Sequence, residues 1–299
     1  MDSYDVVIVG AGPAGLSAAL ILGRCRRRVL ICDHGAPRNS ASHGLHGFLT
    51  RDGIEPSEFL RIGREQLKPY KNVELIQVEV VDGKRSSSGF TLTLADHTTI
   101  TCTKLLLATG VKDRLPEIEG ILPLYGQSVF HCPYCDGWEM RDQKVAVYGA
   151  GESGAGLSLE LTLWTRDLVL CTDGLEISTK DRHRLKTNGV RLREERITRL
   201  NGSNGMLREI EFGSGEPLQR DGLFFSTGQH QGSELARKLG CEINEDGSVR
   251  TGDYETTNIP GLYVAGDASR LVQLAIVAAA EGAQAAFAIN QELLKSALA

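Results

Sequence analysis

Long hydrophobic runs are scarce in this sequence of 299 residues. Its longest apolar stretches fall short of the roughly 20 residues that a membrane-spanning helix needs. The amino-terminal region enters an apolar, strand-like run almost at once, without the basic start and small-residue cleavage site of a secretory signal peptide. We therefore expect no membrane association and a location in the cytoplasm.

Basic tracts and regularly spaced cysteines are also missing. The net charge is −5 and no basic stretch is long enough to act as a nucleic-acid-binding arm, so nucleic acid is not an expected partner. The seven cysteines are odd in number and mostly scattered, unlike the disulfide framework of a small secreted protein. The chain has the composition of a folded globular protein, and its length predicts about two domains.

Two glycine-rich turns predict two dinucleotide-binding units. The first runs from Gly10 to Gly15, between a predicted strand at 4–9 and an apolar helix that follows. Glycines here allow a tight turn and close approach to a pyrophosphate, whose charge the helix N-terminus attracts. Asp33 follows the next predicted strand, 28–32, where an acidic residue can bind a ribose hydroxyl. A glycine turn without a ligand is the alternative.

The second turn runs from Gly149 to Gly154, between a predicted strand at 144–148 and a helix that reaches about residue 164. This repetition of strand, glycine turn and helix predicts an α/β protein with two Rossmann-like domains of three ββα layers. Further strands are predicted at 73–81, 90–94, 99–108, 168–172, 190–192, 208–212, 222–227 and 261–264, and further helices at 56–67 and 273–294.

Other candidate nucleotide contacts lie in a long loop and at two strand ends. The loop 34–53 contains Arg38, Asn39 and His46, although solvation alone also explains a histidine in a loop. Ala108-Thr109-Gly110 ends a predicted strand with small residues that allow a ligand close to the backbone. Asp267 follows another strand, where it either holds a ribityl hydroxyl or caps the next helix.

Cys132 and Cys135 are predicted to be a redox-active pair. A Cys-x-x-Cys pair at a helix start carries reactive thiolate, and Pro133 suits the first turn of a helix. A zinc site would need a second pair of ligands, which the scattered cysteines do not supply, and an inert structural pair is the other alternative. The adjacent Tyr134 and Trp138 are expected to be buried aromatic core rather than to stack on a cofactor ring.

In their order along the chain, these motifs resemble the low-molecular-weight thioredoxin reductases and their flavin-dependent disulfide reductase relatives. The resemblance covers the whole chain and rests on the two glycine turns, Ala108-Thr109-Gly110, the stretch from Cys132 to Gly137, and Ala265-Gly266-Asp267 with Gln273. It implies a homodimer and an FAD-binding domain formed by residues 1–112 and 242–299. Residues 113–241 would be an inserted NAD(P)-type domain that carries the cysteine pair.

The resemblance also implies an FAD-dependent disulfide or dithiol oxidoreductase. Its substrate would be a thioredoxin-like protein or a small-molecule disulfide. Cys135 would face the flavin, Cys132 would exchange with the substrate, and Asp136 would donate and accept the proton. No metal is expected. The implied FAD contacts are Gly10, Gly12, Pro13, Ala14, Gly15, Asp33, Arg38, Asn39, His46, Val80, Ala108, Thr109, Gly110, Gly266, Asp267, Gln273, Leu274 and Ala275.

The second nucleotide unit departs from the family pattern. NADPH-dependent members carry His-Arg-Arg just after its second strand, where arginines pair with the 2′-phosphate. Here the stretch from Leu170 to Leu175 has no arginine, and Asp173 would repel a phosphate. We therefore expect NADPH to be an inefficient electron donor, although Lys180, Arg182 and Arg184 could fold back towards it.

Several electron routes remain open from sequence. They are NADH, ferredoxin, a second flavin in the inserted domain, or oxygen as the acceptor for a dithiol oxidase; a non-catalytic flavin-binding sensor is a further alternative. Dithiol oxidases of the gliotoxin type usually have His where this chain has Asp136, which favours a reductase. Pro133-Tyr134 differs from the Ala-Thr usual in thioredoxin reductases, so the substrate stays open.

Overall fold

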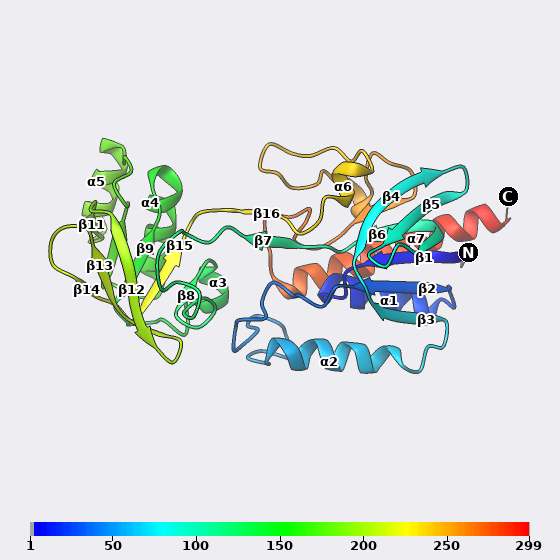
Figure 1. Cartoon of the computed structure of the whole chain (residues 1–299), viewed down its shortest axis with the longest axis horizontal. Coiled ribbons are helices and arrows are strands. Elements are labelled where there is room, and N and C mark those ends of the chain that lie inside the picture. Colours follow the sequence, from blue (N-terminus) through cyan, green and yellow to red (C-terminus); the bar gives the residue numbers. More distant parts are fainter. Residues whose placement is uncertain (1–2, 299) are drawn as a thin grey trace. The chain divides into compact units, whose positions relative to one another are not determined.

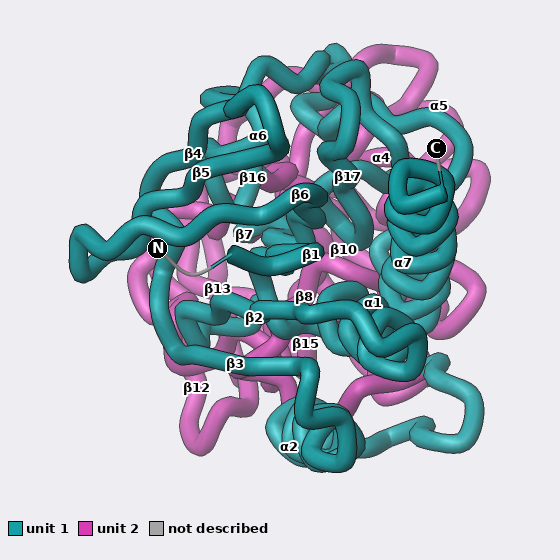
Figure 2. Tube along the Cα trace, turned by 90° about the vertical axis from the view of Figure 1, so that its right-hand side faces the viewer, with its two compact units in different colours: residues 1–38, 47–112, 230–299 teal, residues 39–46, 113–229 magenta. Residues whose placement is uncertain are grey.

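The structure is a computed structural model of the chain and describes residues 3–298. The chain forms two compact units, coloured separately in Figure 2. Unit 1 comprises residues 1–38, 47–112 and 230–299, and unit 2 comprises residues 39–46 and 113–229. Residues 230–241, assigned from sequence to the inserted domain, thus lie in unit 1, and the loop segment 39–46 lies in unit 2.

Unit 1 is built on a mostly parallel sheet of seven strands (Figure 1). These strands are β1 (Ser3–Val9), β2 (Val29–Asp33), β3 (Val73–Gln77), β4 (Val80–Ser86), β5 (Gly89–Leu94), β6 (Thr99–Leu107) and β17 (Leu262–Val264). Their order is β3-β2-β1-β6-β5-β4, with β17 also parallel to β6, while β4 and β5 run antiparallel. The central strands are almost continuously apolar because both faces of the sheet are covered.

Side chains of β1 point alternately to the two faces of the sheet, so the core of unit 1 has two layers. The helices of this unit are α1 (Pro13–Arg24), α2 (Pro56–Leu67), α6 (Leu235–Lys238) and α7 (Ala275–Leu298), with a short 3-10 turn, η2 (Asp253–Glu255). Val6 and Ile8 pack with apolar residues of α1, α2 and α7. Val7 and Val9 point the other way, into a core shared with Phe90 of β5.

Unit 2 repeats this layered plan on a parallel sheet of five strands. These are β8 (Val129–Phe130), β9 (Val145–Tyr148), β10 (Leu168–Cys171), β11 (Arg191–Arg193) and β15 (Gly222–Phe225), in the order β11-β10-β9-β15-β8. The helices are α3 (Pro133–Asp136), α4 (Gly151–Glu160), the 3-10 turn η1 (Leu161–Leu163) and α5 (Thr179–Thr187).

An antiparallel meander covers the other face of this sheet. It consists of β12 (Ile197–Ser203), β13 (Met206–Phe212) and β14 (Leu218–Gln219). Val145 and Val147 of β9 pack towards the helices, whereas Ala146 packs towards the meander. The predicted α/β class with two Rossmann-like ββα units is confirmed.

The chain passes between the units in two segments, β7 (Val111–Asp113) and β16 (Gln229–Gln231), which pair as a small sheet.

The prediction of a single strand at 73–81 is wrong, because β3 and β4 are separate strands that lie at opposite ends of the strand order. Helix α5 was not predicted because only Asp181 and Leu185 of its residues are buried. Within residues 3–298, no helix is both long and apolar enough to cross a bilayer.

Candidate functional site

The turn between β1 and α1 is formed by backbone in close contact. A Cβ atom on Gly10 would lie 2.3 Å from the Ala108 carbonyl oxygen, and one on Gly15 would lie 1.9 Å from the Gly10 carbonyl oxygen. A Cβ on Gly12 would meet no atom within 4 Å, so this glycine borders open space. Gly12 is also the N-cap of α1 and provides no side-chain cap, which leaves N–H groups of the first turn available to an anion.

Asp33 and the stretch after β6 lie next to this turn. Asp33 Oδ1 accepts a hydrogen bond of 3.2 Å from the Ala11 N–H, and its Oδ2 lies 3.0 Å from Arg64 Nη2. Ala108, Thr109 and Gly110 follow directly after β6, the neighbour of β1. The carboxyl ends of β1, β2 and β6 therefore bring these residues to the edge at which doubly wound sheets bind nucleotides.

A third part of unit 1 meets the glycine turn through Gly266. A Cβ on Gly266 would lie 3.2 Å from the Cβ of Ala14. Beside it, Arg38 Nη1 donates to Asp267 Oδ2 at 3.0 Å and to Gln273 Oε1 at 2.7 Å. Since α7 begins only at Ala275, Asp267 does not cap that helix, and the capping alternative is wrong.

The remaining candidate contacts are divided between the units. Pro13 begins α1, Val80 is the buried first residue of β4, and Leu274 precedes Ala275 at the start of α7. Asn39 and His46 lie in the segment that belongs to unit 2.

Sequence reasoning missed a buried ion network below the Gly266 turn. Glu281 of α7 accepts a hydrogen bond of 2.8 Å from the Gly266 N–H and one of 2.6 Å from Arg270 Nε. Arg270 also donates to the buried carboxylate of Glu255 at 2.9 Å. An acidic residue inside an alanine-rich helix was the available signal, because a buried carboxylate needs such partners.

Cys132 and Cys135 form a disulfide in unit 2, with a Cα–Cα distance of 5.3 Å. Cys132 is the N-cap of α3, and its Sγ accepts a hydrogen bond of 3.2 Å from the Cys135 N–H. Pro133 is the first helical residue, as predicted. The expectation that Tyr134 and Trp138 are buried is wrong, since their exposed fractions are 66% and 65%. Helix α3 is a single turn in which Pro133 is fully buried and Asp136 is partly buried.

Asp136 ends α3 directly after the disulfide. Burial raises the pKa of its carboxyl to about 7, and the negative charge of Glu139 contributes to the increase. Nearby, His131 Nδ1 lies 3.6 Å from Asp113 Oδ2, which also accepts a hydrogen bond of 2.5 Å from the Tyr125 hydroxyl. A carboxyl with a pKa near neutrality can both give and take a proton, as acid–base work beside a disulfide requires.

The glycine turn of unit 2 repeats the geometry of the first. The Gly149 N–H donates to the Cys171 carbonyl oxygen at 3.2 Å, just as the Gly10 N–H donates to that of Cys32 at 2.8 Å. Helix α4 also starts without a side-chain cap. Ser226-Thr227-Gly228 follows β15 as Ala108-Thr109-Gly110 follows β6. Unit 2 therefore retains the backbone of a dinucleotide-type turn.

The end of β10 differs from the end of β2. Thr172 occupies the first position after β10, and its buried Oγ1 has no hydrogen-bond partner within the described part of the chain. Asp173 is engaged instead in the fold, because its Oδ1 accepts a hydrogen bond of 2.7 Å from the Ile197 N–H and its Oδ2 one of 3.2 Å from the Tyr148 hydroxyl.

The cations suggested from sequence as a phosphate clamp are mostly paired. Arg182 makes a bidentate contact with Glu194, and Arg184 Nη1 lies 2.9 Å from Asp181 Oδ1. Sequence reasoning did not name Arg196, which is exposed. Burial and Asp173 raise the pKa of the Tyr148 hydroxyl to about 12, and the positive charge of Arg196 opposes that rise.

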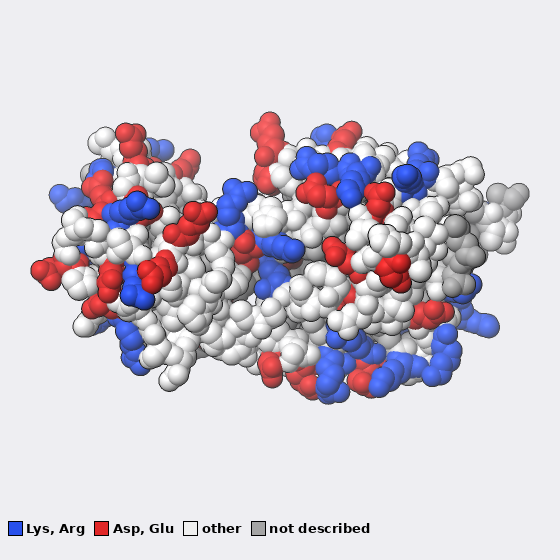
Figure 3. All heavy atoms as spheres, in the orientation of Figure 1, with Lys and Arg blue, Asp and Glu red and all other residues white. Residues whose placement is uncertain are grey.

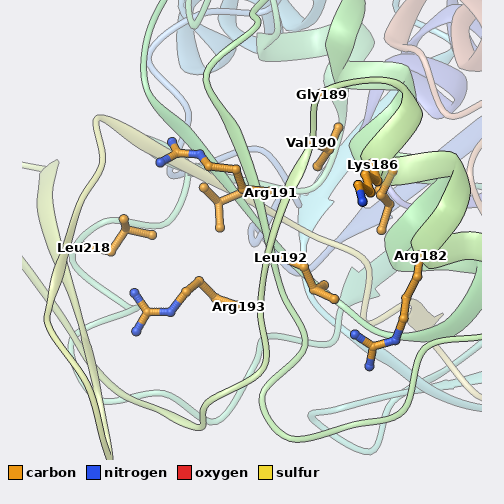
Figure 4. Close-up of a pocket in the computed structure, with 10 residues that line it drawn as sticks. Arg182, Lys186, Gly189, Val190, Arg191, Leu192, Arg193 and Leu218 are labelled. Carbon is orange, nitrogen blue, oxygen red and sulfur yellow. The ribbon is translucent and has the colours of Figure 1, made fainter.

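A separate pocket of about 630 Å³ lies beside α5 and β11 (Figure 4). Four cationic side chains and five apolar ones line it together with Gly189, namely Arg182, Lys186, Arg191, Arg193, Val169, Leu185, Val190, Leu192 and Leu218. Its arginines pair with carboxylates, as Arg191 does with Asp167 and Arg193 with Glu195. On the face shown in Figure 3, acidic and basic side chains are likewise interspersed on both units. Of the cations suggested from sequence as phosphate contacts, Arg182 is the one that lines this pocket.

Comparison with known proteins agrees with this geometry. The family model described as pyridine nucleotide-disulphide oxidoreductase matches residues 4–282. The crystal structure of a provisionally named thioredoxin reductase TrxB from Bacillus anthracis has a TM-score of 0.93 and 35% identity, covering 98% of this chain and 99% of that one. An oxidoreductase from Agrobacterium tumefaciens has a TM-score of 0.91 and 32% identity, with coverage of 98% and 99%.

A curated relative is similar over most of its length. Thioredoxin reductase tcpT of Claviceps purpurea is 29% identical over 279 residues, which are 88% of this chain and 86% of that protein. The chain belongs to the pyridine nucleotide-disulphide oxidoreductase family and is similar to thioredoxin reductases. It is an oxidoreductase and a flavoprotein, and family membership implies FAD as the cofactor.

Proposed function

We propose that this protein is an FAD-dependent disulfide oxidoreductase that exchanges electrons through the Cys132–Cys135 pair. The observation that carries the proposal is the disulfide at the start of α3, followed at once by Asp136, whose pKa is raised to about 7. Opening a disulfide produces two thiolates, so an adjacent acid with a pKa near neutrality balances the charge.

The residues of unit 1 fit an FAD molecule. Open space beside Gly12 and the uncapped start of α1 would receive the pyrophosphate, and Asp33 would bind a ribose hydroxyl. The Arg38–Asp267 pair stands beside Gly266 and would contact the ribityl chain. When bound, the flavin supplies a centre that accepts and donates an electron pair. Val80, Leu274 and Ala275 would complete its surroundings.

In this proposal the two cysteines have different roles. Cys135 faces the flavin, Cys132 exchanges with the substrate, and Asp136 handles the proton. The substrate is a disulfide or dithiol, carried by a thioredoxin-like protein or by a small molecule, and the enzyme acts as a homodimer in the cytoplasm. The inserted domain is the unit that carries the cysteine pair and the second glycine turn.

The proposed electron donor is not NADPH. Support comes from the end of β10, where Thr172, Asp173 and Gly174 stand in place of an arginine clamp, and Asp173 is held by Ile197 and Tyr148. NADH carries no 2′-phosphate and avoids this difficulty, and the intact backbone of the turn from Gly149 favours it as the alternative donor. Ferredoxin or a second flavin are the donors that remain if NADH also reacts slowly.

An anaerobic dithionite titration tests the proposed chemistry. The wild-type protein should take up twice as many electrons as its bound flavin alone accepts, since the disulfide accepts a second pair. The Cys132→Ser/Cys135→Ser double variant should take up only the flavin's pair. Equal uptake by both proteins would show that the disulfide is not redox-active and would favour a flavin-binding sensor.

A further inference from the structure

His46, from the long loop after β2, lies beside Glu139 in unit 2. Its Nε2 is 3.6 Å from Glu139 Oε1. The segment 39–46 is fixed by Gln127, whose Oε1 lies 2.8 Å from His43 Nδ1 and whose amide nitrogen donates to the Ala41 carbonyl oxygen. His46 is thus held against the turn that follows the disulfide.

Asp136 and Glu139 lie on the same side of that turn. Helical hydrogen bonds continue past α3, because the Gly137 N–H donates to the Pro133 carbonyl oxygen at 2.8 Å and the Met140 N–H to that of Asp136 at 3.3 Å. Residues three apart are neighbours in this conformation. Of the two Glu139 oxygens, Oε2 is buried and has no hydrogen-bond partner within residues 3–298. A protonated Asp136 is the kind of donor that this oxygen lacks.

The charges around this pair favour a shared proton. Burial and the negative charge of Glu139 both raise the pKa of Asp136, so one proton on the two carboxyls is more stable than two adjacent charges. The imidazole of His46 faces Glu139 from the loop. His131, which precedes Cys132, faces Asp113, and Tyr125 donates a hydrogen bond to the same carboxylate.

We propose that Asp136 and Glu139 share one proton and that His46 exchanges this proton with solvent, a relay that rests on the disulfide chemistry proposed above. Bound reduced flavin would supply the electron pair that breaks the S–S bond. Both sulfurs then become thiolates, and Asp136 gives its proton to one of them. The His46 imidazolium returns a proton to Asp136 through Glu139, and His46 then takes one from water. Oxidation of the dithiol runs these transfers in reverse.

Glu139 and His46 are positioning residues in this relay, since they act through Asp136. Their test is the rate at which dithiothreitol opens the disulfide, followed by alkylation of the released thiols at several pH values. His46→Ala and Glu139→Gln should each slow opening about tenfold near pH 7, and Glu139→Gln should move the pH profile, because the acid that protonates the leaving sulfur is perturbed. Imidazole in the buffer should restore the rate of His46→Ala.

Matched controls come from exposed positions of the same unit. His183→Ala and Glu216→Gln should keep the wild-type rate and profile. Glu139→Asp retains a carboxylate and should keep the wild-type pH profile, which decides the matter if Glu139→Gln does not fold. Wild-type rates in both test variants, or slowing of His46→Ala that imidazole does not reverse, would overturn the relay. Failure of the proposed function itself is separate, because it would show as missing disulfide electrons in the dithionite titration of the wild type.

Discussion

Thr172 holds in unit 2 the position that Asp33 holds in unit 1. Each residue directly follows the strand residue whose carbonyl oxygen accepts a hydrogen bond from the first glycine of the neighbouring turn, Cys171 in one unit and Cys32 in the other. Asp33 contacts the Ala11 N–H, whereas the Thr172 hydroxyl is buried without a hydrogen-bond partner in the described chain. Unit 2 therefore has the same kind of turn but lacks, at this position, the acidic group that we propose to bind a ribose hydroxyl in unit 1.

Gly12→Asp should produce a folded protein that retains little FAD. The new carboxylate would enter the space proposed for the pyrophosphate, and two negative charges at close range in a partly desolvated site should weaken binding at least roughly tenfold. Gly213→Asp is the control, because Gly213 is exposed in unit 2 and a Cβ there would meet no atom closer than 3.8 Å. Flavin absorbance per protein after desalting measures occupancy, and full occupancy in Gly12→Asp would place the cofactor elsewhere.

Cys132→Ser should show a long-wavelength charge-transfer absorbance after reduction of any mixed disulfide. If Cys135 faces the flavin, its thiolate lies against the oxidised ring and donates charge to it. Cys135→Ser should lack this band. The absorbance spectrum of each variant across a pH titration checks the order, and a band confined to Cys135→Ser would reverse the two roles.

Asp136→Asn should remove part of the pH dependence of stability. The pKa of Asp136 is raised from 3.8 to about 7 in the folded protein, so the folded state keeps a proton that the unfolded state loses. The resulting stabilisation is complete below about pH 4 and is lost as pH rises through about 7, by at most about 4 kcal/mol. The free energy of unfolding of Asp136→Asn, measured relative to that of the wild type, should therefore be higher at pH 8 than at pH 5.

Urea unfolding at these two pH values measures the difference. Asp142→Asn, in an exposed turn of the same unit, is the control and should follow the wild type. A difference between Asp136→Asn and wild type that does not change with pH would mean that Asp136 is ionised in the folded protein throughout this range.

The features of the candidate site that could be predicted from sequence are those determined by short stretches of neighbouring residues. The turn from Gly10, Asp33 at the end of β2 and Pro133 at the start of α3 all depend on local backbone requirements. The ββα layering likewise follows from apolar strands that alternate with glycine turns and helices.

Tertiary contacts are what sequence could not supply. His46 meets Glu139 only because the loop segment 39–46 joins unit 2, and no local pattern marks that destination. Tyr134 was expected in the core because aromatic rings favour burial, yet a one-turn helix gives it no core to enter. Sequence placed Asp173 where the 2′-phosphate of a cofactor would lie. In the structure its carboxylate accepts a hydrogen bond from the N–H of Ile197, and so links the end of β10 to β12.

NADPH should reduce the bound flavin of this protein much more slowly than it reduces the flavin of a thioredoxin reductase that has arginines for the 2′-phosphate. Without a bidentate arginine contact to the 2′-phosphate, binding should be weaker by ~3 kcal/mol, or roughly a hundredfold. NADH should react at least as well as NADPH, because it carries no phosphate at that position. Anaerobic stopped-flow mixing with each nicotinamide, followed by flavin bleaching, measures both rates.

Binding of the 2′-phosphate by Arg196 would contradict this prediction. Arg196 is exposed close to Tyr148, whereas Arg182 and Arg184 are held by Glu194 and Asp181. Arg196→Ala should leave both bleaching rates unchanged, and so should the control Arg199→Ala, which removes an exposed arginine that pairs with Glu119. If micromolar NADPH bleaches the wild type within milliseconds and Arg196→Ala abolishes that reaction, the phosphate clamp exists and has moved from the end of β10 to the residue before β12. Slow bleaching by both nicotinamides would instead leave ferredoxin, a second flavin or oxygen as the exchange partner. The electrons of the disulfide would then be exchanged without a nicotinamide cofactor bound at the second glycine turn.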